Sequence, residues 1–425
     1  MKDYDVLAGR AATFSKGPEF FGVEFEPSVV TSGQGAYVFD CYGQRWLDWI
    51  SSLGALILGH PNPHDRLYPD PREAPANKWA RAVCHQVWSS AGFSLPHRLE
   101  RETAERLVDL LSAHVPGWQG QRLGLRWGKT GSDACSMAVR LARAVTGWGG
   151  IVSVGYHGWH DKFVSLTPPA WGVVYDTDGS ESMHSVPYGD VIRLHEWLEI
   201  YKDPAWAAVI IEQPPQPVPA GYWQEVRRLC TEYGALLILD EVVTGLRYGL
   251  GGAAERFGIE PDIICMGKAL GNGMPISCIV GRREYFEWFS RNDPVFVSST
   301  SFGEAVSLAA CNAVLNVWDQ SCVDHLWAIG GALMEGLAKA GYQVTGYPPV
   351  SLVQHETPSH RAYFIREMAR RGILMNRPNI PNLAHTMKDV GQTITAAAAV
   401  KRAMGKVEVE VEMAGKLPQV LFSNR

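Results

Sequence analysis

The chain has 425 residues, of which 46% are hydrophobic, so it is long enough to bury a large core and to form more than one domain. Its formal net charge of −5 gives no reason to expect nucleic acid or a membrane as a partner, and no run of about 18 apolar residues or signal-peptide pattern occurs. The eight cysteines are scattered without CxxC pairs, which predicts reduced, mostly structural thiols in a cytoplasmic protein.

Two features stand out before residue 80. Residues 36–40 and 46–50 are short apolar and aromatic runs on either side of a Tyr42-Gly43 turn, which predicts a hairpin. Residues 59–76 contain five prolines, which predicts a long loop. This loop is either an insertion near the mouth of a site or a neutral surface excursion.

A helix with a glycine and a serine at its start is predicted next. Thr130-Gly131-Ser132-Asp133 precede apolar residues that recur every three or four positions as far as Val145, and Gly147 ends the pattern. A Gly-Ser turn at the start of a helix presents unpaired N–H groups and the positive end of the helix dipole, which suits a phosphate. A capped helix that binds nothing is the alternative.

Four apolar runs further along predict buried strands, and an amphipathic helix is predicted at 223–233. Such alternation of strands and helices predicts an α/β fold with a mostly parallel sheet and a site at the carboxyl ends of its strands. The four predicted strands are residues 151–154, 207–211, 235–239 and 263–266.

An acid and a lysine follow two of these strands. Asp240 comes directly after the strand at 235–239, and Lys268 follows the strand at 263–266 after one glycine. Pyridoxal 5'-phosphate (PLP) requires such a pair, because an amine holds its aldehyde as a Schiff base and an anion keeps its ring nitrogen protonated. Either residue alone is more often a surface group, so the pair carries the argument.

Three further segments are candidates for the same site. Tyr156 follows the strand at 151–154 and could lie against a cofactor ring, and Glu212 ends the strand at 207–211. The hydroxyl-rich segment 298–301 precedes an alanine-rich helix; its hydroxyls could bind a phosphate or simply begin that helix.

No metal site is predicted. His157 and His160 are three residues apart, but the Gly-Trp pair between them favours a turn.

With these motifs the chain resembles the class III branch of fold-type I PLP-dependent aminotransferases, and within it the group around glutamate-1-semialdehyde 2,1-aminomutase. The motifs occur in the family's order from about residue 20 to about residue 400, so the resemblance covers nearly the whole chain. The matching segments are Leu56–His60, Gly131–Ala134, Val139–Arg143, Tyr156–Gly158, Asp240–Val242, Thr244–Arg247, Lys268, Thr300–Ala310, Leu383–Thr386 and Asp389.

The resemblance implies roles around the cofactor ring. Lys268 would form the Schiff base and then move protons between the substrate carbon and the cofactor. Asp240 would pair with the ring nitrogen. Val242 and Tyr156 would pack on the two faces of the ring.

The resemblance also implies how the phosphate is held. Gly131 and Ser132 would cradle it, and Thr300 would reach it from the neighbouring subunit, so a homodimer with shared active sites is expected. His157 and Glu212 are implied cofactor-binding residues as well, and this role explains His157 without a metal.

The implied domain organisation has three segments. Residues 56–310 would form a large PLP-binding domain, with helices on both faces of the sheet. Residues 1–55 and 311–425 would together form a smaller α+β domain.

The chain departs from the family pattern at several places. Val243 stands where many family aminotransferases carry a glutamine, which is closer to the aminomutase subgroup. Ser52-Leu53-Gly54-Ala55 replaces the Ser-Trp-Gly-Pro that lies near the substrate in the aminomutase, so Ser52 and Leu53 are candidate substrate residues. Arg377 is either a ligand for a substrate carboxylate or a solvated loop residue.

Four functions are compatible with the sequence. The leading one is transfer of an amino group between an amine or amino acid and a carbonyl compound. The runner-up is amine migration, decarboxylation or racemisation with the same cofactor, which makes all three bonds at the substrate carbon labile. A catalytically silent relative is disfavoured by Lys268, Asp240 and Tyr156. A nicotinamide-dependent dehydrogenase is disfavoured because no GxGxxG motif follows the first strand.

Overall fold

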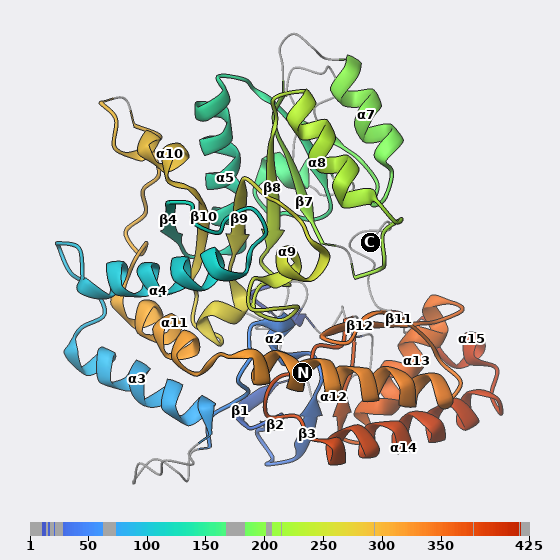
Figure 1. The fold of residues 1–425 in the computed structure, drawn as a ribbon. Coiled ribbons are helices and arrows are strands. Elements are labelled where there is room, and N and C mark those ends of the chain that lie inside the picture. Colours follow the sequence, from blue (N-terminus) through green and yellow to red (C-terminus); the bar gives the residue numbers. More distant parts are fainter. Residues whose placement is uncertain are drawn as a thin grey trace. The chain divides into compact units, whose positions relative to one another are not determined.

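The chain forms two compact units in a computed structural model (Figure 1). The structure describes residues 11–13, 16–17, 21, 29–62, 74–166, 183–200, 206–213, 215–292, 294–376, 378–415 and 417. Unit 1 comprises residues 1–53, 57–72 and 325–425, and unit 2 comprises residues 54–56 and 73–324. The boundary that the family resemblance implied between residues 310 and 311 falls within one helix, α11 (Ala305–Val317), of unit 2.

Unit 2 is built on a seven-stranded sheet with the order β4-β10-β9-β8-β7-β5-β6. Strand β10 is antiparallel to both of its neighbours, and the pairs from β9 to β6 are all parallel, so the predicted mostly parallel α/β sheet is confirmed. The strands are β4 (Leu123–Gly128), β5 (Gly150–Val154), β6 (Met183–Ser185), β7 (Trp206–Glu212), β8 (Leu236–Glu241), β9 (Ile263–Met266) and β10 (Ser277–Arg282).

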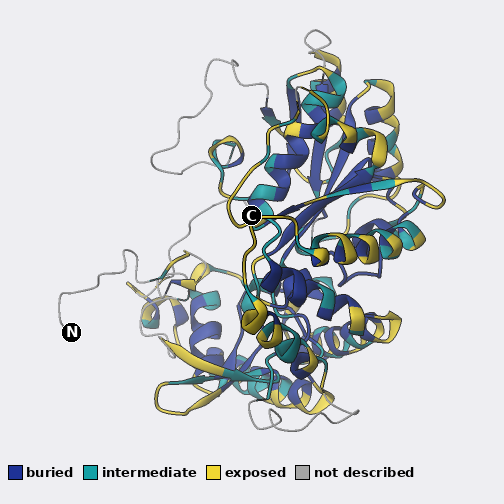
Figure 2. Ribbon diagram, turned by 90° about the vertical axis from the view of Figure 1, so that its left-hand side faces the viewer, coloured by how far each residue is buried: buried dark blue, intermediate teal, exposed yellow. Residues whose placement is uncertain are grey.

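Both faces of the central strands are buried, which explains their continuous apolar runs. In β8, Leu236 and Ile238 belong to the core cluster that includes α5 (Gly131–Thr146). Leu237 and Leu239 point to the opposite face of the sheet and are also fully buried. Strands covered on both faces need apolar residues at every position rather than at alternate ones. Figure 2 shows these strands as the buried centre of the unit.

Helix α5 has the ends that its sequence predicts. Thr130 and Asp133 form a capping box at its start, and Gly147 ends it in a left-handed conformation with φ of 75°. Its apolar face packs against strands β7 to β10. The start of α5 follows β4 directly, so it lies at the edge of the sheet where the parallel strands end.

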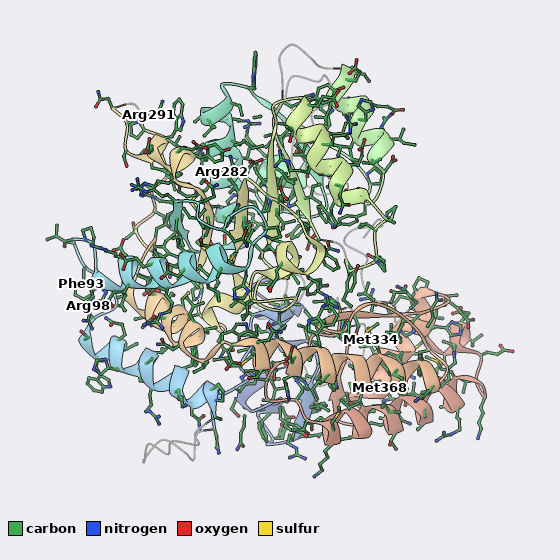
Figure 3. All side chains as sticks on the ribbon, viewed as in Figure 1. Phe93, Arg98, Arg282, Arg291, Met334 and Met368 are labelled. Atoms are coloured by element: carbon green, nitrogen blue, oxygen red, sulfur yellow. The ribbon has the colours of Figure 1, made fainter. Side chains whose placement is uncertain are left out.

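The remaining helices of unit 2 pack on the sheet or on one another, and the predicted helix at 223–233 is α8. Phe93 lies in the connection between α3 and α4, and Arg98 begins α4 (Figure 3). The helices are α3 (Pro75–Ser89), α4 (Arg98–His114), α6 (Asp161–Val164), α7 (Val191–Ile200), α8 (Tyr222–Glu232), α9 (Gly252–Phe257), η4 (Lys268–Gly271), α10 (Arg283–Phe286) and η5 (Glu287–Phe289).

The loop predicted for residues 59–76 is wrong at its end, because α3 begins at Pro75. Proline suits the first turn of a helix, where its missing N–H loses no hydrogen bond and its fixed φ is already helical. The middle of the predicted loop, residues 63–73, lies outside the described residues.

Unit 1 joins the two ends of the chain in one sheet. The predicted hairpin is confirmed as β2 (Tyr37–Asp40) and β3 (Arg45–Asp48), with β1 (Val30–Gln34) paired to β2. Strand β13 (Ile373–Leu374) then pairs in parallel with β3, with Ile373 opposite Leu47. This pairing agrees with the implied α+β domain built from both ends.

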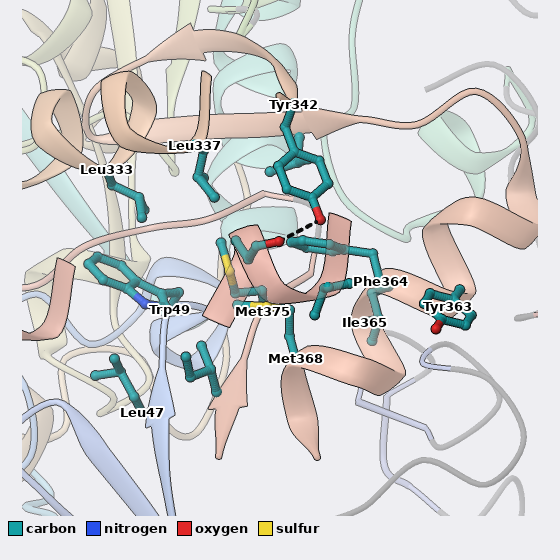
Figure 4. Packing of buried hydrophobic residues seen from close by; sticks show 14 of the residues in the cluster. Leu47, Trp49, Leu333, Leu337, Tyr342, Tyr363, Phe364, Ile365, Met368 and Met375 are labelled. Carbon is teal, nitrogen blue, oxygen red and sulfur yellow. Dashed lines mark hydrogen bonds between the residues drawn. The ribbon is translucent and has the colours of Figure 1, made fainter. Parts of the chain in front are cut away.

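The core of unit 1 packs aromatic and sulfur-containing side chains from several segments (Figure 4). The Trp49 indole donates to Thr393 Oγ1 at 2.8 Å, and the Tyr342 hydroxyl donates to the Ala397 carbonyl at 3.0 Å. The elements around this core are α12 (Gln320–Lys339), β11 (Gln343–Tyr347), β12 (Val350–Gln354), α13 (Pro358–Ala369), α14 (Met387–Met404) and α15 (Val409–Glu412). Across the described residues of both units, every helix is too short or too polar to cross a membrane.

Candidate active site

The predicted acid and lysine lie at the ends of neighbouring strands of unit 2. Asp240 is the penultimate residue of β8, and its register partner on β7 is Glu212. Lys268 follows β9, the next strand on the other side of β8, after Gly267. The sheet order therefore brings Glu212, Asp240 and Lys268 to one edge, although they come from three separate βα units.

The Asp240 carboxylate is buried and takes part in three hydrogen bonds among the described residues. Its Oδ2 lies 2.8 Å from His157 Nδ1 and accepts from the Cys135 thiol at 3.2 Å. Its Oδ1 accepts from the Val242 N–H at 3.0 Å. Burial lowers the pKa of His157, but its hydrogen bonds with Asp240 and Cys135 outweigh that effect and raise the pKa to about 10. His157 is therefore protonated at neutral pH.

Cys135 is a member of this network that the sequence did not indicate. It lies on the buried face of α5, where a cysteine predicts an ordinary core residue. The facing atoms of Cys135, His157 and Asp240 lie within 4.8 Å of one another, close enough to hold a metal ion. Their mutual hydrogen bonds account for the arrangement, and burial strongly raises the pKa of the Cys135 thiol, so the sulfur is neutral at ordinary pH.

Lys268 has a backbone conformation that only tertiary structure can impose. Its φ is 40°, in the left-handed region that residues with a side chain rarely adopt, and it is the first residue of η4. Strained residues of this kind concentrate at functional sites. Burial lowers the pKa of the Lys268 amine, while the charges of Glu212 and Asp240 oppose the shift. A lowered pKa increases the fraction of neutral, nucleophilic amine.

Glu212 is held by two donors from different segments. Its Oε2 accepts from the Tyr156 backbone N–H at 3.2 Å and from the Tyr188 hydroxyl at 3.1 Å. Burial and the nearby charge of Asp240 raise the pKa of Glu212. Tyr188 was missed at the sequence level, because it lies in a turn far from every predicted motif.

The start of α5 is closely approached by two loops. Ser132 Oγ accepts from the Trp159 N–H at 3.1 Å, and a Cβ on Gly158 would overlap Ser132. A Cβ on Gly131 would come within 2.7 Å of the Val242 side chain. Glycine at both positions therefore lets the two loops pack closely on the helix start, beside Val242, two residues after Asp240. This glycine-lined helix start, the buried acid and the lysine at the same sheet edge fit the phosphate, ring nitrogen and aldehyde of PLP.

Replacing Gly158 with alanine is expected to weaken PLP binding at least tenfold and to destabilise the protein by about 1–3 kcal/mol. Gly158 has φ of 105°, and the added methyl group would collide with Ser132. PLP titration and thermal unfolding measure the two effects. Gly147→Ala is the matched control, because Gly147 has φ of 75° with open space around it. If both variants bound PLP equally well, the close packing of Gly158 on Ser132 would have no role in binding.

Thr300 lies in a turn before α11 and is exposed in the single chain. The end of this turn is fixed by Glu304, which caps α11 and pairs with Lys129 at 2.6 Å. Lys129 immediately precedes the capping residue of α5, so the hydroxyl-rich segment is tied to the region of the helix start. The contact of Thr300 with a phosphate in the neighbouring subunit stays a prediction.

Two of the tentative substrate residues, Ser52 and Leu53, belong to unit 1. Ser52 and Leu53 have φ of 51° and 58°, so they continue a left-handed turn that begins at Ser51. Ser51 is fixed there, because its hydroxyl donates to the Ile380 carbonyl at 2.7 Å. Arg377 lies outside the described residues. A substrate role for these residues stays a prediction.

Comparison with known proteins identifies the family. The model of the family described as aminotransferase class-III matches residues 22–347. The glutamate-1-semialdehyde 2,1-aminomutase of Thermomicrobium roseum is 33% identical over 419 residues, covering 89% of this chain and 91% of the relative. The aminomutase of the same name from Halobacterium salinarum is 32% identical and covers 86% of this chain and 79% of the relative.

Solved structures share the fold. An omega-transaminase from Sphaerobacter thermophilus has a TM-score of 0.74 at 25% identity, covering 89% of this chain and 92% of that one. A glutamate-1-semialdehyde aminomutase from Pseudomonas aeruginosa has a TM-score of 0.74 at 20% identity, covering 88% and 87%. The fold and the resemblance inferred from the motifs are thus confirmed: the chain belongs to the class-III aminotransferase family.

Proposed function

We propose that this protein transfers an amino group between an amine or amino acid and a carbonyl compound, with PLP as its cofactor. The observation that carries the proposal is the convergence of Glu212, Asp240 and Lys268 at the ends of three adjacent strands, in a member of the class-III aminotransferase family. An amine beside a buried, hydrogen-bonded carboxylate is the arrangement that this cofactor requires.

Bound PLP withdraws electrons from the bonds at the substrate carbon and so makes them labile. The chain supplies positioning and proton handling. The Lys268 amine would hold the aldehyde group and would later carry a proton to and from the substrate carbon. Asp240 would pair with the ring nitrogen, while His157 and Cys135 hold its Oδ2 in place. Ser132 and the N–H groups at the start of α5 would bind the phosphate.

Amine migration within one substrate is the second candidate. Its support comes from the relatives named glutamate-1-semialdehyde 2,1-aminomutase, which match this chain over most of its length. Val243, where many family aminotransferases have glutamine, points the same way. The two reactions use the same lysine and the same acid, so the substrate pocket decides between them.

A homodimer with shared active sites is part of the proposal, with Thr300 of one subunit contacting the phosphate held by the other. The exposure of Thr300 in the single chain leaves its hydroxyl available for this contact. A cytoplasmic location is proposed as well. Free thiols at the exposed Cys41 and Cys84 are compatible with a reducing compartment.

The visible spectrum of the purified protein tests the proposal, recorded with PLP before and after a panel of amino acids and amines is added. An absorption band that bleaches with a donor and returns with a keto acid or aldehyde is the expected result. A band that shifts with one substrate but recovers without a second would favour amine migration, decarboxylation or racemisation. A protein that forms no band with added PLP would refute the proposal.

A further inference from the structure

Tyr188 is an exposed aromatic residue whose hydroxyl reaches the active-site edge of the sheet. Its side chain is 41% exposed, yet Oη donates to Glu212 Oε2 at 3.1 Å. The backbone around it is a turn, in which the Asp190 N–H donates to the Pro187 carbonyl at 3.3 Å. Gly189, the third residue of that turn, has φ of 79°, as in a type II turn. The turn fixes the position from which Tyr188 extends.

A glycine leaves the space that the Tyr188 hydroxyl occupies. Gly155 directly follows β5 with φ of 105°, and a Cβ there would overlap Tyr188 Oη and lie 3.0 Å from Glu212 Cβ. The hydroxyl thus sits against bare backbone at the carboxyl end of β5. This close approach is independent of the hydrogen bond and places Tyr188 at the same edge as the catalytic candidates.

Glu212, the acid that Tyr188 holds, lies at the same sheet edge as Lys268, with β8 between their two strands. Both protein donors to Glu212, Tyr188 Oη and the Tyr156 N–H, contact the same oxygen, Oε2. Across the described residues no hydrogen bond reaches Oε1, so that oxygen is available to cofactor or substrate. The negative charge of Glu212 raises the pKa of the Lys268 amine against the lowering effect of burial.

We propose that Tyr188 is a positioning residue of the active site: its hydroxyl fixes Oε2 of Glu212, so that the carboxyl group keeps its place at the sheet edge that also carries Lys268. The proposal rests on the proposed function only in taking Lys268 as the reacting amine. Other charges around the two groups are the same with and without the Tyr188 hydroxyl. Glu212 is faced by Asp240 and His157, and Lys268 by Asp240, Cys135 and Arg247.

The test measures the pH at which the Lys268 amine of the PLP-free protein becomes reactive. An amine-selective acylating reagent is applied over a range of pH, and labelling of the Lys268 peptide is quantified by mass spectrometry. In Tyr188→Phe, Glu212 loses a hydrogen-bond donor that favours its charged form. Less negative charge then stabilises the protonated Lys268 amine, so the pKa of this amine falls. The labelling midpoint is expected to fall by about 0.5 to 1 pH unit.

Two comparisons make the result specific. Tyr233→Phe removes another hydroxyl that donates to a glutamate, Glu199 of α7, and the midpoint should not move. Glu212→Gln should lower the midpoint at least as much as Tyr188→Phe. In the Glu212→Gln background, Tyr188→Phe should add no further shift, because the charge that it positions is gone.

Three outcomes would overturn the proposal. They are an unchanged midpoint in Tyr188→Phe, an equal shift in Tyr233→Phe, and a shift that persists in the Glu212→Gln background. With a donor found by the spectral panel, kcat of Tyr188→Phe should also fall about 5- to 10-fold with KM changed less than about twofold. The labelling uses no PLP, so a failed spectral test would refute the proposed function without affecting this result.

Discussion

Replacing Lys268 with alanine is expected to lower amino-group transfer by about 10⁴-fold or more, because one side chain supplies both the amine that holds PLP and the mobile proton. Protein loaded with PLP and reduced with borohydride should gain a covalent adduct on the Lys268 peptide. In Lys268→Ala no protein-bound adduct should form. Mass spectrometry of the peptides and steady-state kinetics measure the two effects.

The control is Lys339→Ala, which removes an exposed lysine whose partner, Glu335, lies one helical turn earlier in α12. This variant should keep full activity and full adduct formation. An adduct on another peptide of Lys268→Ala, or activity within tenfold of the parent protein, would show that Lys268 is not the reacting amine.

Asp240→Asn is expected to lower activity by about 10²- to 10⁴-fold and to destabilise the PLP-free protein by about 3–5 kcal/mol. The amide removes the anion that pairs with a protonated ring nitrogen. It also removes the partner of the buried His157 imidazolium. Activity assays and calorimetric unfolding measure the two losses separately.

The pH dependence of stability identifies the cause of the expected loss of stability in Asp240→Asn. The pKa of His157 is about 10 in the folded protein, above its ordinary value of about 6.5. The stabilisation that protonated His157 gives the folded protein is therefore complete below pH ~6.5. It is lost as the pH rises from about 6.5 to about 10, because the folded protein then gives up a proton that the unfolded chain has already lost. In Asp240→Asn the larger of the two interactions that raise the pKa of His157 is lost, so burial lowers this pKa and the decline should become much smaller.

Asp262→Asn is the matched control for Asp240→Asn. Asp262 is also a buried acid with a cationic partner, Arg227 at 2.8 Å, but it precedes β9 at the opposite end of the sheet. This variant should lose stability while its PLP affinity and the pH dependence from His157 are retained. If Asp240→Asn kept the decline between pH 6.5 and 10, the His157–Asp240 pair would not be its origin.

The sheet and its functional edge could be predicted because their causes are local. Strands such as 235–239 are apolar at every position, and polar residues appear where each strand ends, at Asp240, Glu212 and Lys268. Capping residues such as Thr130 and Gly147 likewise predict the ends of α5 from short-range chemistry.

The rest of the site depends on contacts that no local pattern encodes. In the sequence, Cys135 is indistinguishable from the other apolar residues of its helix, because only the fold of β8 places Asp240 beside it. Tyr188 is likewise an ordinary turn residue in the sequence, and only the fold places its hydroxyl against the glycine that follows β5. The positive φ of Lys268 could not be predicted either, because glycine and asparagine are the residues that usually indicate such a conformation and this position has a lysine. The loop predicted through residue 76 was wrong because its last proline begins a helix rather than preventing one.

The pairing of β13 with β3 has a consequence for synthesis on the ribosome. Ile373 and Leu47 are 326 residues apart, so the amino-terminal hairpin leaves the ribosome long before the strand that completes its sheet. At about 5 to 20 residues per second, the hairpin waits roughly 15 to 65 seconds. During that interval the β3 edge and the apolar face around Trp46 and Trp49, both buried in the finished protein, are open to other chains. Newly made copies therefore pass through an aggregation-prone state that ends only when β13 has emerged and paired with β3.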